Sequence, residues 1–397
     1  MSGDQGHDHR GRTHAAYSMP LHVFSFPTAI TFGVGARAEV AGYLRMRELL
    51  RPLLVTDSAV AKLPLTIDFI GRLEAEKRAM AIFAGVRGNP AASQVSAGVA
   101  AFRAHQADSI ISLGGGAVLD VAKAIALMTG HAGDILEYAW DHPERRAVLA
   151  PLPHLIALPT TSGTGSEVGR SAVISDDRSH VKKVIFFPAL LPRAVFADPE
   201  FTLALPPRIT AATGIDALTH NIESYLSPTY HPICDGIAVE GVRLAARALP
   251  AAFHAGGDLS ARTDLMMASM LGAIAFQKDL GAVHACAHAL GAVLDVHHGL
   301  ANGVMLDHVM RFNAVAASEK LSELARVAGA GHTADDFIAW LTRLKAELGI
   351  PPGIASLGAD AEHVGKLSEL AFEDSCHLTN PRPCTREDFG RIFTQAL

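Results

Sequence analysis

The first half of the chain alternates short apolar runs with longer, alanine-rich stretches. Buried strands are predicted at 52–57, 78–83, 109–113 and 154–159, and an early strand pair at 24–26 and 29–32. The stretches between them, such as 93–105 and 118–128, have the length and composition of helices. Strands that alternate with helices predict a parallel sheet covered by helices, which is a Rossmann-like α/β domain.

The pattern changes near Leu205, and almost every later segment has helical periodicity. Helices are predicted at 237–253, 261–276, 318–328, 333–348 and 385–397. Thr333 and Thr385 are each followed three residues later by an aspartate, as at a helix N-cap. We therefore expect an α/β domain over 19–204 and an all-α domain over 205–397. Residues 1–18 are polar and rich in histidine, and they are predicted to be a disordered tail.

Composition narrows the class of protein. A length of 397 residues favours two domains, and 49% hydrophobic with 19% charged residues is typical of a well-buried globular protein. A net charge of -6 gives no reason to expect a nucleic-acid partner. No apolar run is long enough to cross a membrane. The four cysteines show no CxxC spacing, so a reducing cytoplasm is expected.

Two polar loops follow predicted strands. Gly114, Gly115 and Gly116 precede the helix at 118–128, where free backbone N–H groups favour a phosphate. This run is neither GxGxxG nor a Walker loop, and a plain tight turn explains it equally well. The loop 160–167 is dense in threonine, serine and glycine, and on its own it could be a capped polar loop. Two such loops at the carboxyl ends of neighbouring strands would flank one crevice, which indicates a nucleotide site.

Asp57 ends the predicted strand at 52–57. A carboxylate there can accept hydrogen bonds from a ribose diol and repels a 2′-phosphate, which favours NAD over NADP. An N-cap or Asx-turn role fits the local sequence equally well.

Histidines and carboxylates gather in two segments of the second half. Asp216 and His220 are four residues apart, as are His284 and His288, and on a helix this spacing places both side chains on one face. His297 and His298 follow, and Glu223 shares the face of the first pair. Imidazoles and carboxylates among apolar residues indicate a divalent-metal site with nitrogen and oxygen ligands. The candidates outnumber the ligands of one site, and spacing does not choose among them.

Together these motifs resemble the iron-containing (group III) alcohol dehydrogenase family over nearly the whole chain after the tail. Five segments carry the resemblance in order: 114–123, 159–167, 214–220, 281–291 with His298-Gly299, and 378–382. The resemblance implies an NAD(P)-binding α/β domain and an all-helical domain, the dehydroquinate synthase-like fold, with the active site in the cleft between them. It also implies a dimer or larger homo-oligomer.

The resemblance assigns roles by position. The metal ligands would be Asp216, His220, His284 and His298, and His288 would lie beside the reacting centre as a proton relay. His297 and Glu223 would then support the site or be structural. The positions that match cofactor contacts are Asp57, Gly115, Gly116, Asp120, Thr160, Thr161 and Lys182. The implied activity is hydride transfer between NAD(H) and a small alcohol or aldehyde on the metal, and Fe²⁺ and Zn²⁺ both suit the ligand set.

The chain departs from the family pattern at several positions. Ala117 and Gly169 replace hydroxyl residues, and Arg170 and Lys278 add positive charge near segments expected to border the cleft. One hypothesis is that Arg170 and Lys278 hold an anionic substrate group, such as the carboxylate of 4-hydroxybutyrate or succinic semialdehyde. The alternative is that both form structural salt bridges.

Other activities are compatible with parts of the pattern. A dehydroquinate synthase-like lyase and a hydroxyacid–oxoacid transhydrogenase would keep the fold and the cofactor. A metal-dependent hydrolase would need no nucleotide, and the glycine and threonine loops argue against it.

Overall fold

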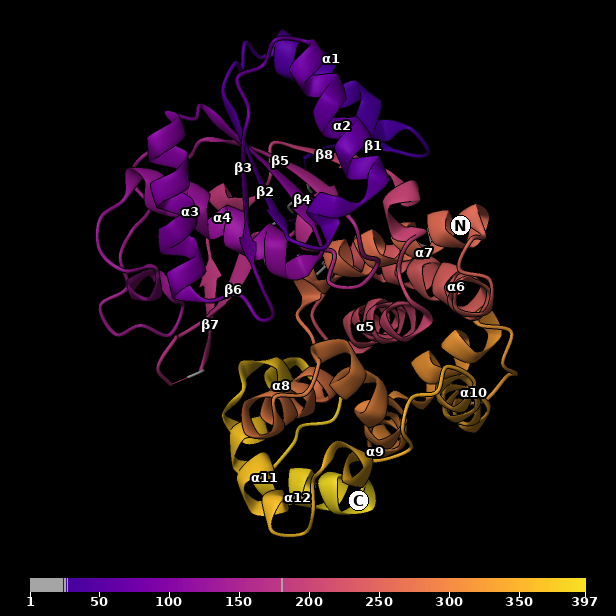
Figure 1. Ribbon diagram of the computed structural model, residues 1–397. Coiled ribbons are helices and arrows are strands. Elements are labelled where there is room, and N and C mark those ends of the chain that lie inside the picture. Colours follow the sequence, from indigo (N-terminus) through magenta and orange to yellow (C-terminus); the bar gives the residue numbers. More distant parts are fainter. Residues whose placement is uncertain (1–23, 25, 27, 180) are drawn as a thin grey trace, which may run out of the picture.

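The computed structural model describes Phe24, Phe26 and residues 28–179 and 181–397. The predicted tail at 1–18 lies outside the described residues. Figure 1 shows an α/β half built from the first part of the chain and a helical half built from the rest.

The α/β half is centred on one sheet of six parallel strands in the order β1-β8-β5-β4-β2-β3. Its strands are β1 (Ala29–Phe32), β2 (Pro52–Asp57), β3 (Ala81–Val86), β4 (Ser109–Gly114), β5 (His154–Pro159) and β8 (Ala194–Ala197). The strands predicted at 52–57 and 154–159 are confirmed. The strand predicted at 78–83 begins three residues late, because Lys77 turns the chain with a φ of 59° just before it. The predicted early strand pair is wrong, because β1 pairs with the distant β8 and neither Phe24 nor Phe26 lies in a strand.

Helices cover both faces of this sheet. Leu54 packs with α1 (Glu39–Met46) and α2 (Pro64–Ala75), whereas its neighbours Leu53 and Val55 pack with α3 (Ala92–His105) and α4 (Gly116–Gly130). Burial on both faces explains why the strands read as continuous apolar runs rather than alternating ones. The predicted parallel, Rossmann-like arrangement is therefore confirmed.

A two-stranded antiparallel hairpin adds to this half and was not predicted. It consists of β6 (Ser171–Ser175) and β7 (Lys182–Phe186). The hairpin is tied to α4, because the amide of Val173 donates to Asp120. It places Lys182 at the edge of the α/β half that faces the helices of the other half.

The second half of the chain is helical, as predicted. Its helices are α5 (Pro207–Leu226), α6 (Pro232–His254), α7 (Leu259–Ala275), α8 (Ala282–Leu294), α9 (His298–Val327), α10 (Ala334–Glu347), α11 (His363–Glu373) and α12 (Arg386–Gln395). Thr333 and Thr385 each form a capping box with the aspartate three residues on, which confirms both predicted N-caps. One hydrophobic core cluster joins these helices.

Helix α5 lies near the middle of the molecule, with α8 and α9 on the side away from the α/β half (Figure 1), and it packs against α6, α7 and α9. From Thr210 to its end it is buried almost all round, which explains how polar residues on it come to lie in the interior.

The chain passes from the sheet to the helices between Ala197 and Pro207. The predicted boundary at 204/205 falls in this connection, and the division into two separately folding domains stays a prediction. Within the described part of the chain, no helix combines the length and apolarity needed to cross a bilayer.

Candidate active site

Three helices bring one carboxylate and three imidazoles together. Asp216 and His220 lie one turn apart on α5, His284 lies on α8, and His298 is the first residue of α9. Ligand atoms of Asp216, His220 and His284 all lie within 4.8 Å of one another. His298 Nε2 lies 3.5 Å from Asp216 Oδ1, and the rings of His220 and His284 stack with centroids 4.8 Å apart. The four positions that the resemblance assigned to the metal are thus neighbours in space.

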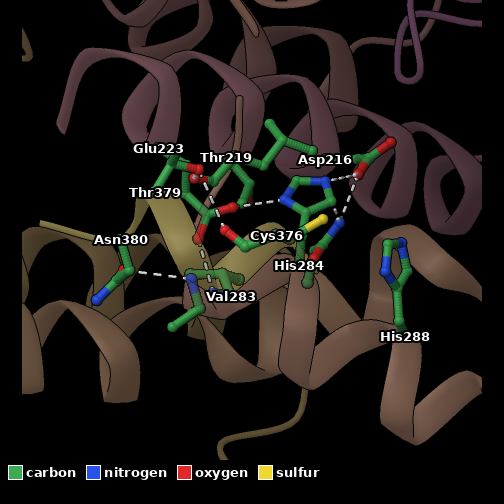
Figure 2. Close-up of polar contacts among 12 residues, drawn as sticks. Asp216, Thr219, Glu223, Val283, His284, His288, Cys376, Thr379 and Asn380 are labelled. Atoms are coloured by element: carbon green, nitrogen blue, oxygen red, sulfur yellow. Dashed lines mark hydrogen bonds and ion pairs between the residues drawn. The ribbon is translucent and has the colours of Figure 1, made fainter. Parts of the chain in front are cut away.

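Glu223 supports this cluster from the side. Its carboxylate accepts hydrogen bonds from the amide of Val283 at 2.7 Å and from Nδ1 of His284 at 2.5 Å (Figure 2). Burial alone would lower the pKa of His284, but Glu223 and then Asp216 raise it. Because the Nδ1 proton is held by Glu223, the Nε2 lone pair of His284 is directed toward Asp216.

Asn302 shows that the cluster suits a cation. Its Nδ2 lies 2.7 Å from Asp216 Oδ1 and 3.2 Å from Nε2 of both His284 and His298. An amide nitrogen has two hydrogens, so it cannot satisfy three acceptors. In addition, Nδ1 of His220 and Oδ1 of Asn302 are buried without a hydrogen-bond partner in the described part of the chain. Lone pairs that converge in a dry site fit a divalent cation with nitrogen and oxygen ligands.

His288 lies beside the cluster, one turn after His284 on α8 (Figure 2). Its side chain is 37% exposed, and its ring stacks on His298 with centroids 5.3 Å apart. Nδ1 of His288 donates to Oδ2 of Asp374 at 2.7 Å, while Oδ1 of Asp374 accepts from the amide of Cys376 at 2.8 Å. Nε2 of His288 therefore remains available for proton exchange.

Three residues of the site were not predicted from the sequence: Asn302, Asp374 and Cys376. Asn302 follows His298 by four residues, so the same spacing rule that paired Asp216 with His220 could have found it. Asp374 and Cys376 precede the 378–382 segment, but only the fold places them against His288.

The two polar loops lie against each other, as predicted. They follow the adjacent strands β4 and β5, and the amide of Thr160 donates to the carbonyl of Gly114 at 3.0 Å. A Cβ placed on Gly116 would come within 2.7 Å of the side chain of Thr164, so this close approach requires glycine. The loops meet at the carboxyl ends of the strands and at the N-terminus of α4, which is where open α/β sheets bind phosphate groups.

The threonine loop also packs against α5 and α7. The hydroxyl of Ser269 on α7 donates to the carbonyl of Gly163, in the threonine loop, at 3.1 Å. A Cβ on Gly163 would come within 2.8 Å of Thr213 on α5. The candidate nucleotide loop and the candidate metal site are therefore adjacent.

The predicted cofactor residues Asp57 and Lys182 have geometries that leave their roles open. Oδ1 of Asp57 accepts from the amides of Ala59 and Val60, each at 2.8 Å, as an Asx-turn residue does. These bonds use one carboxylate oxygen and leave Oδ2 for a ribose.

Burial lowers the pKa of Lys182, whose Nζ lies 3.6 Å from where a Cβ on Gly291 of α8 would stand. Lys182 thus reaches the helical half.

Asp120 is engaged by the protein itself. Oδ1 accepts from the hydroxyl of Ser166 at 2.6 Å and Oδ2 from the amide of Val173 at 3.0 Å. Beneath it, the buried Lys123 donates to Ser166 and Ser171, and burial lowers the pKa of Lys123 to about 8. This geometry favours a role for Asp120 in holding the threonine loop in place over a direct contact with a cofactor.

Lys278 and Arg170 differ in their surroundings. Lys278 is fully buried and its Nζ forms an ion pair with Asp235 on α6, so the structural salt bridge describes it and an anion-binding role does not. Arg170 is half-buried, and its guanidinium lies 5.5 Å from the centroid of the Phe186 ring. Among the described residues Arg170 has no ion-pair partner.

Comparisons with known proteins show the family. Residues 27–199 match the model of the iron-containing alcohol dehydrogenase family, and residues 210–397 match the model of the C-terminal part of the Fe-containing alcohol dehydrogenase family. The chain is 36% identical over 394 residues to 1,3-propanediol dehydrogenase of Klebsiella pneumoniae, covering 96% of this chain and 98% of that protein. It is 37% identical over 356 residues to 4-hydroxybutyrate dehydrogenase of Cupriavidus necator, covering 87% and 92%.

A solved structure agrees as well. Sulfoacetaldehyde reductase from Bifidobacterium kashiwanohense in complex with NAD⁺ has a TM-score of 0.89 to this chain at 27% identity, covering 95% of this chain and 99% of that one. Two family models and relatives matched over almost their full length lead to one conclusion: this chain is a member of the iron-containing alcohol dehydrogenase family of oxidoreductases.

Proposed function

We propose that the protein is a metal-dependent NAD(H) alcohol dehydrogenase or aldehyde reductase that acts on a small substrate between its α/β and helical halves. The observation that carries the proposal is the close packing of Gly163 against Thr213 on α5, the helix that carries Asp216 and His220, because it joins a convergent ligand cluster to a phosphate-binding type of loop. A hydrolase would have no use for that adjacency.

Asp216, His220, His284 and His298 would hold the cation, and the family favours Fe²⁺ with Zn²⁺ as the alternative. When bound, the cation polarises the substrate oxygen and the nicotinamide exchanges a hydride with the carbinol carbon. Glu223 orients the ring of His284 through Nδ1. The side-chain amide of Asn302 is directed at the same ligand cluster, where it contacts Asp216.

Gly115, Gly116, Thr160 and Thr161 would line the phosphate groups of the nucleotide at the N-terminus of α4. Oδ2 of Asp57 would accept from the ribose diol, which favours NAD over NADP. Lys182 would contact the nucleotide from the hairpin, and Asp120 would hold the threonine loop in position.

His288 moves the proton in this proposal. Nε2 of His288 takes the proton that an alcohol releases and returns it when an aldehyde is reduced. Asp374 holds the ring through Nδ1, which keeps Nε2 directed at the reacting group.

The substrate is proposed as a small alcohol or aldehyde. The names of the relatives include one neutral diol and one hydroxy acid. If an anionic group is bound, Arg170 alone of the two proposed cations is free to bind it, because Lys278 is already paired. A homodimer or larger homo-oligomer in the cytoplasm completes the proposal, and the four cysteines, all free, suit a reducing compartment.

The test is NADH consumption by Fe²⁺-loaded protein with matched aldehydes, pairing propionaldehyde with succinic semialdehyde. Turnover of either supports the dehydrogenase. A preference for the acid that Arg170→Gln abolishes supports an anion contact at Arg170, with Lys183→Gln on the neighbouring hairpin as the matched control. Substrate conversion without net NADH change would point to the transhydrogenase or the lyase, and failure to bind NADH would contradict the proposal.

A further inference from the structure

A second group of metal-ligating side chains lies next to the first. One ligand atom each from His288, Asp374 and Cys376 lie within 4.8 Å of one another, and all three residues are partly exposed. His288 comes from α8, Asp374 directly follows α11, and Cys376 lies in the short 3-10 helix Ser375–Thr379. None of the three belongs to the Asp216, His220, His284 and His298 cluster.

The three side chains are held toward one another. Asp374 accepts from Nδ1 of His288 at 2.7 Å and from the amide of Cys376 at 2.8 Å. The hydroxyl of Thr379 donates to the carbonyl of Leu280 at 2.9 Å, which fixes the 3-10 helix against the segment that precedes α8. The geometry therefore does not depend on a mobile loop.

The local charge favours a cation. Burial raises the pKa of the Cys376 thiol well above its usual range, and the carboxylates of Asp374, Glu223 and Asp279 raise it further. These carboxylates have no lysine or arginine ion-pair partner among the described residues. A divalent cation would offset this negative field and would replace the thiol proton.

From this geometry we infer that His288, Asp374 and Cys376 form a second divalent-cation site, selective for thiophilic ions such as Zn²⁺ and Co²⁺ over Mg²⁺. One imidazole, one carboxylate and one thiolate with water in the fourth position is a normal tetrahedral zinc set. Binding releases the thiol proton to solvent, and the proton of the neutral His288 ring moves from Nδ1 to Nε2 as Nδ1 takes the cation. The histidine cluster offers four protein ligands and this group offers three, so the histidine cluster fills first.

Occupancy has a consequence for the enzyme. A cation on His288 removes the group that exchanges the substrate proton, so excess Zn²⁺ inhibits turnover. This inhibition rests on the proposed function, whereas the binding itself does not.

The test uses Co²⁺ as the probe on protein whose histidine cluster has first been filled with one equivalent of Zn²⁺, which is spectroscopically silent. The histidine cluster contains no sulfur, so a near-ultraviolet thiolate-to-cobalt absorption band reports only a site with a cysteine. We expect one further Co²⁺ per chain together with this band, and loss of both in Cys376→Ser. Cys384→Ser alters a cysteine outside the group and keeps both.

Asp374→Asn should weaken Co²⁺ binding at least tenfold while the Zn²⁺ content of the first site stays at one per chain, which shows that the variant is folded. The absence of a thiolate band at any Co²⁺ concentration would overturn the inference, as would a band that persists in Cys376→Ser. A band in a protein without dehydrogenase activity would leave the second site standing and reject the proposed function. Dehydrogenase activity without a band would leave the proposed function standing and reject the second site.

Discussion

Glu223 Oε2 lies 2.5 Å from Nδ1 of His284, on the side of the ring away from Asp216. The helical spacing made Glu223 as good a candidate ligand as Asp216. In the fold, Glu223 instead faces Nδ1 of the candidate ligand His284. It accepts the Nδ1 proton of His284 in a hydrogen bond and leaves Nε2 of His284 free for a metal. Both residues are fully buried, so this hydrogen bond acts in a medium of low dielectric.

Replacing Glu223 with glutamine should therefore weaken metal binding without removing a ligand. The amide can present its NH₂ to Nδ1 and so destabilise the tautomer that the site needs. We expect a loss of about ten- to a hundredfold in Zn²⁺ affinity, the usual range for groups that orient a ligand. Competition with a chromophoric chelator measures it, and Glu319→Gln on the exposed side of α9 is the control. Unchanged affinity in Glu223→Gln would show that the contact is only structural.

The adjacent histidines His297 and His298 offer a matched pair. His298 lies 3.5 Å from Asp216 Oδ1, whereas His297 precedes α9 with an exposed side chain. His298→Ala should lower the metal affinity by more than about a hundredfold, beyond the range of supporting groups, and His297→Ala should leave it nearly unchanged. Metal content after dialysis against a weak chelator decides between them. Equal losses would mean that the chain around the start of α9 is placed differently.

How well the sequence predicts an element of the fold depends on how far apart along the chain the interacting residues lie. Strands at 52–57 and 154–159 are continuous apolar runs with clear ends, and both were predicted to the residue. The partner of β1 was not predicted. It is β8, which lies about 165 residues further along the chain, and the local pattern carries no information on that pairing. Two roles stayed open for Lys278 for the same reason, since its partner Asp235 is 43 positions away.

The site shows the same division. Spacing placed Asp216 with His220, and His284 with His288, on common faces, and the fold confirms both pairs. Spacing alone could not separate His284 from His288. That difference arises because Nδ1 of His288 bonds to Asp374, the residue after α11, whereas Nδ1 of His284 bonds to Glu223 on α5.

Asp279 adopts a backbone conformation that is almost reserved for glycine. Its φ is 63° and its ψ is -178°, a region that costs a non-glycine residue about 1–3 kcal/mol. Asp279→Gly should raise the free energy of unfolding by about 1 kcal/mol, after the greater chain entropy of glycine is subtracted. Urea unfolding measures it. Gln106→Gly, at the ordinary left-handed values of 53° and 46°, should change stability less. A destabilised Asp279→Gly variant would show that the side chain contributes more than its backbone costs.

Asp307 and Lys345 form a buried pair that should make stability depend on pH. Their side chains are 4% and 3% exposed. Burial alone would raise the pKa of Asp307, but Lys345 and Thr342 lower it, while burial lowers the pKa of Lys345. Because the folded pKa of Asp307 is below the unfolded one, its contribution is complete above about pH 4 and is lost as the pH falls through the folded value.

Asp307→Asn leaves the Lys345 ammonium buried without its carboxylate. We expect a loss of about 3–5 kcal/mol at neutral pH, because the remaining charge is uncompensated. The difference from the unaltered protein should shrink as the pH falls below about 4, because the unfolded chain then binds a proton at Asp307 that the folded protein binds only at lower pH. Unfolding in denaturant at several pH values tests this, with the exposed Asp335→Asn as control. A difference that does not vary with pH would contradict the lowered pKa of Asp307.

If the proposed function is right, the ligand cluster and the nucleotide loops work together as one dehydrogenase site. The most direct measurement is NADH oxidation with propionaldehyde and succinic semialdehyde by protein stripped of metal, before and after one equivalent of Fe²⁺. We expect no turnover before Fe²⁺ is added, turnover after it is added, and no turnover in His220→Ala at any Fe²⁺ concentration. Equal turnover with and without metal, or full activity in His220→Ala, would contradict it.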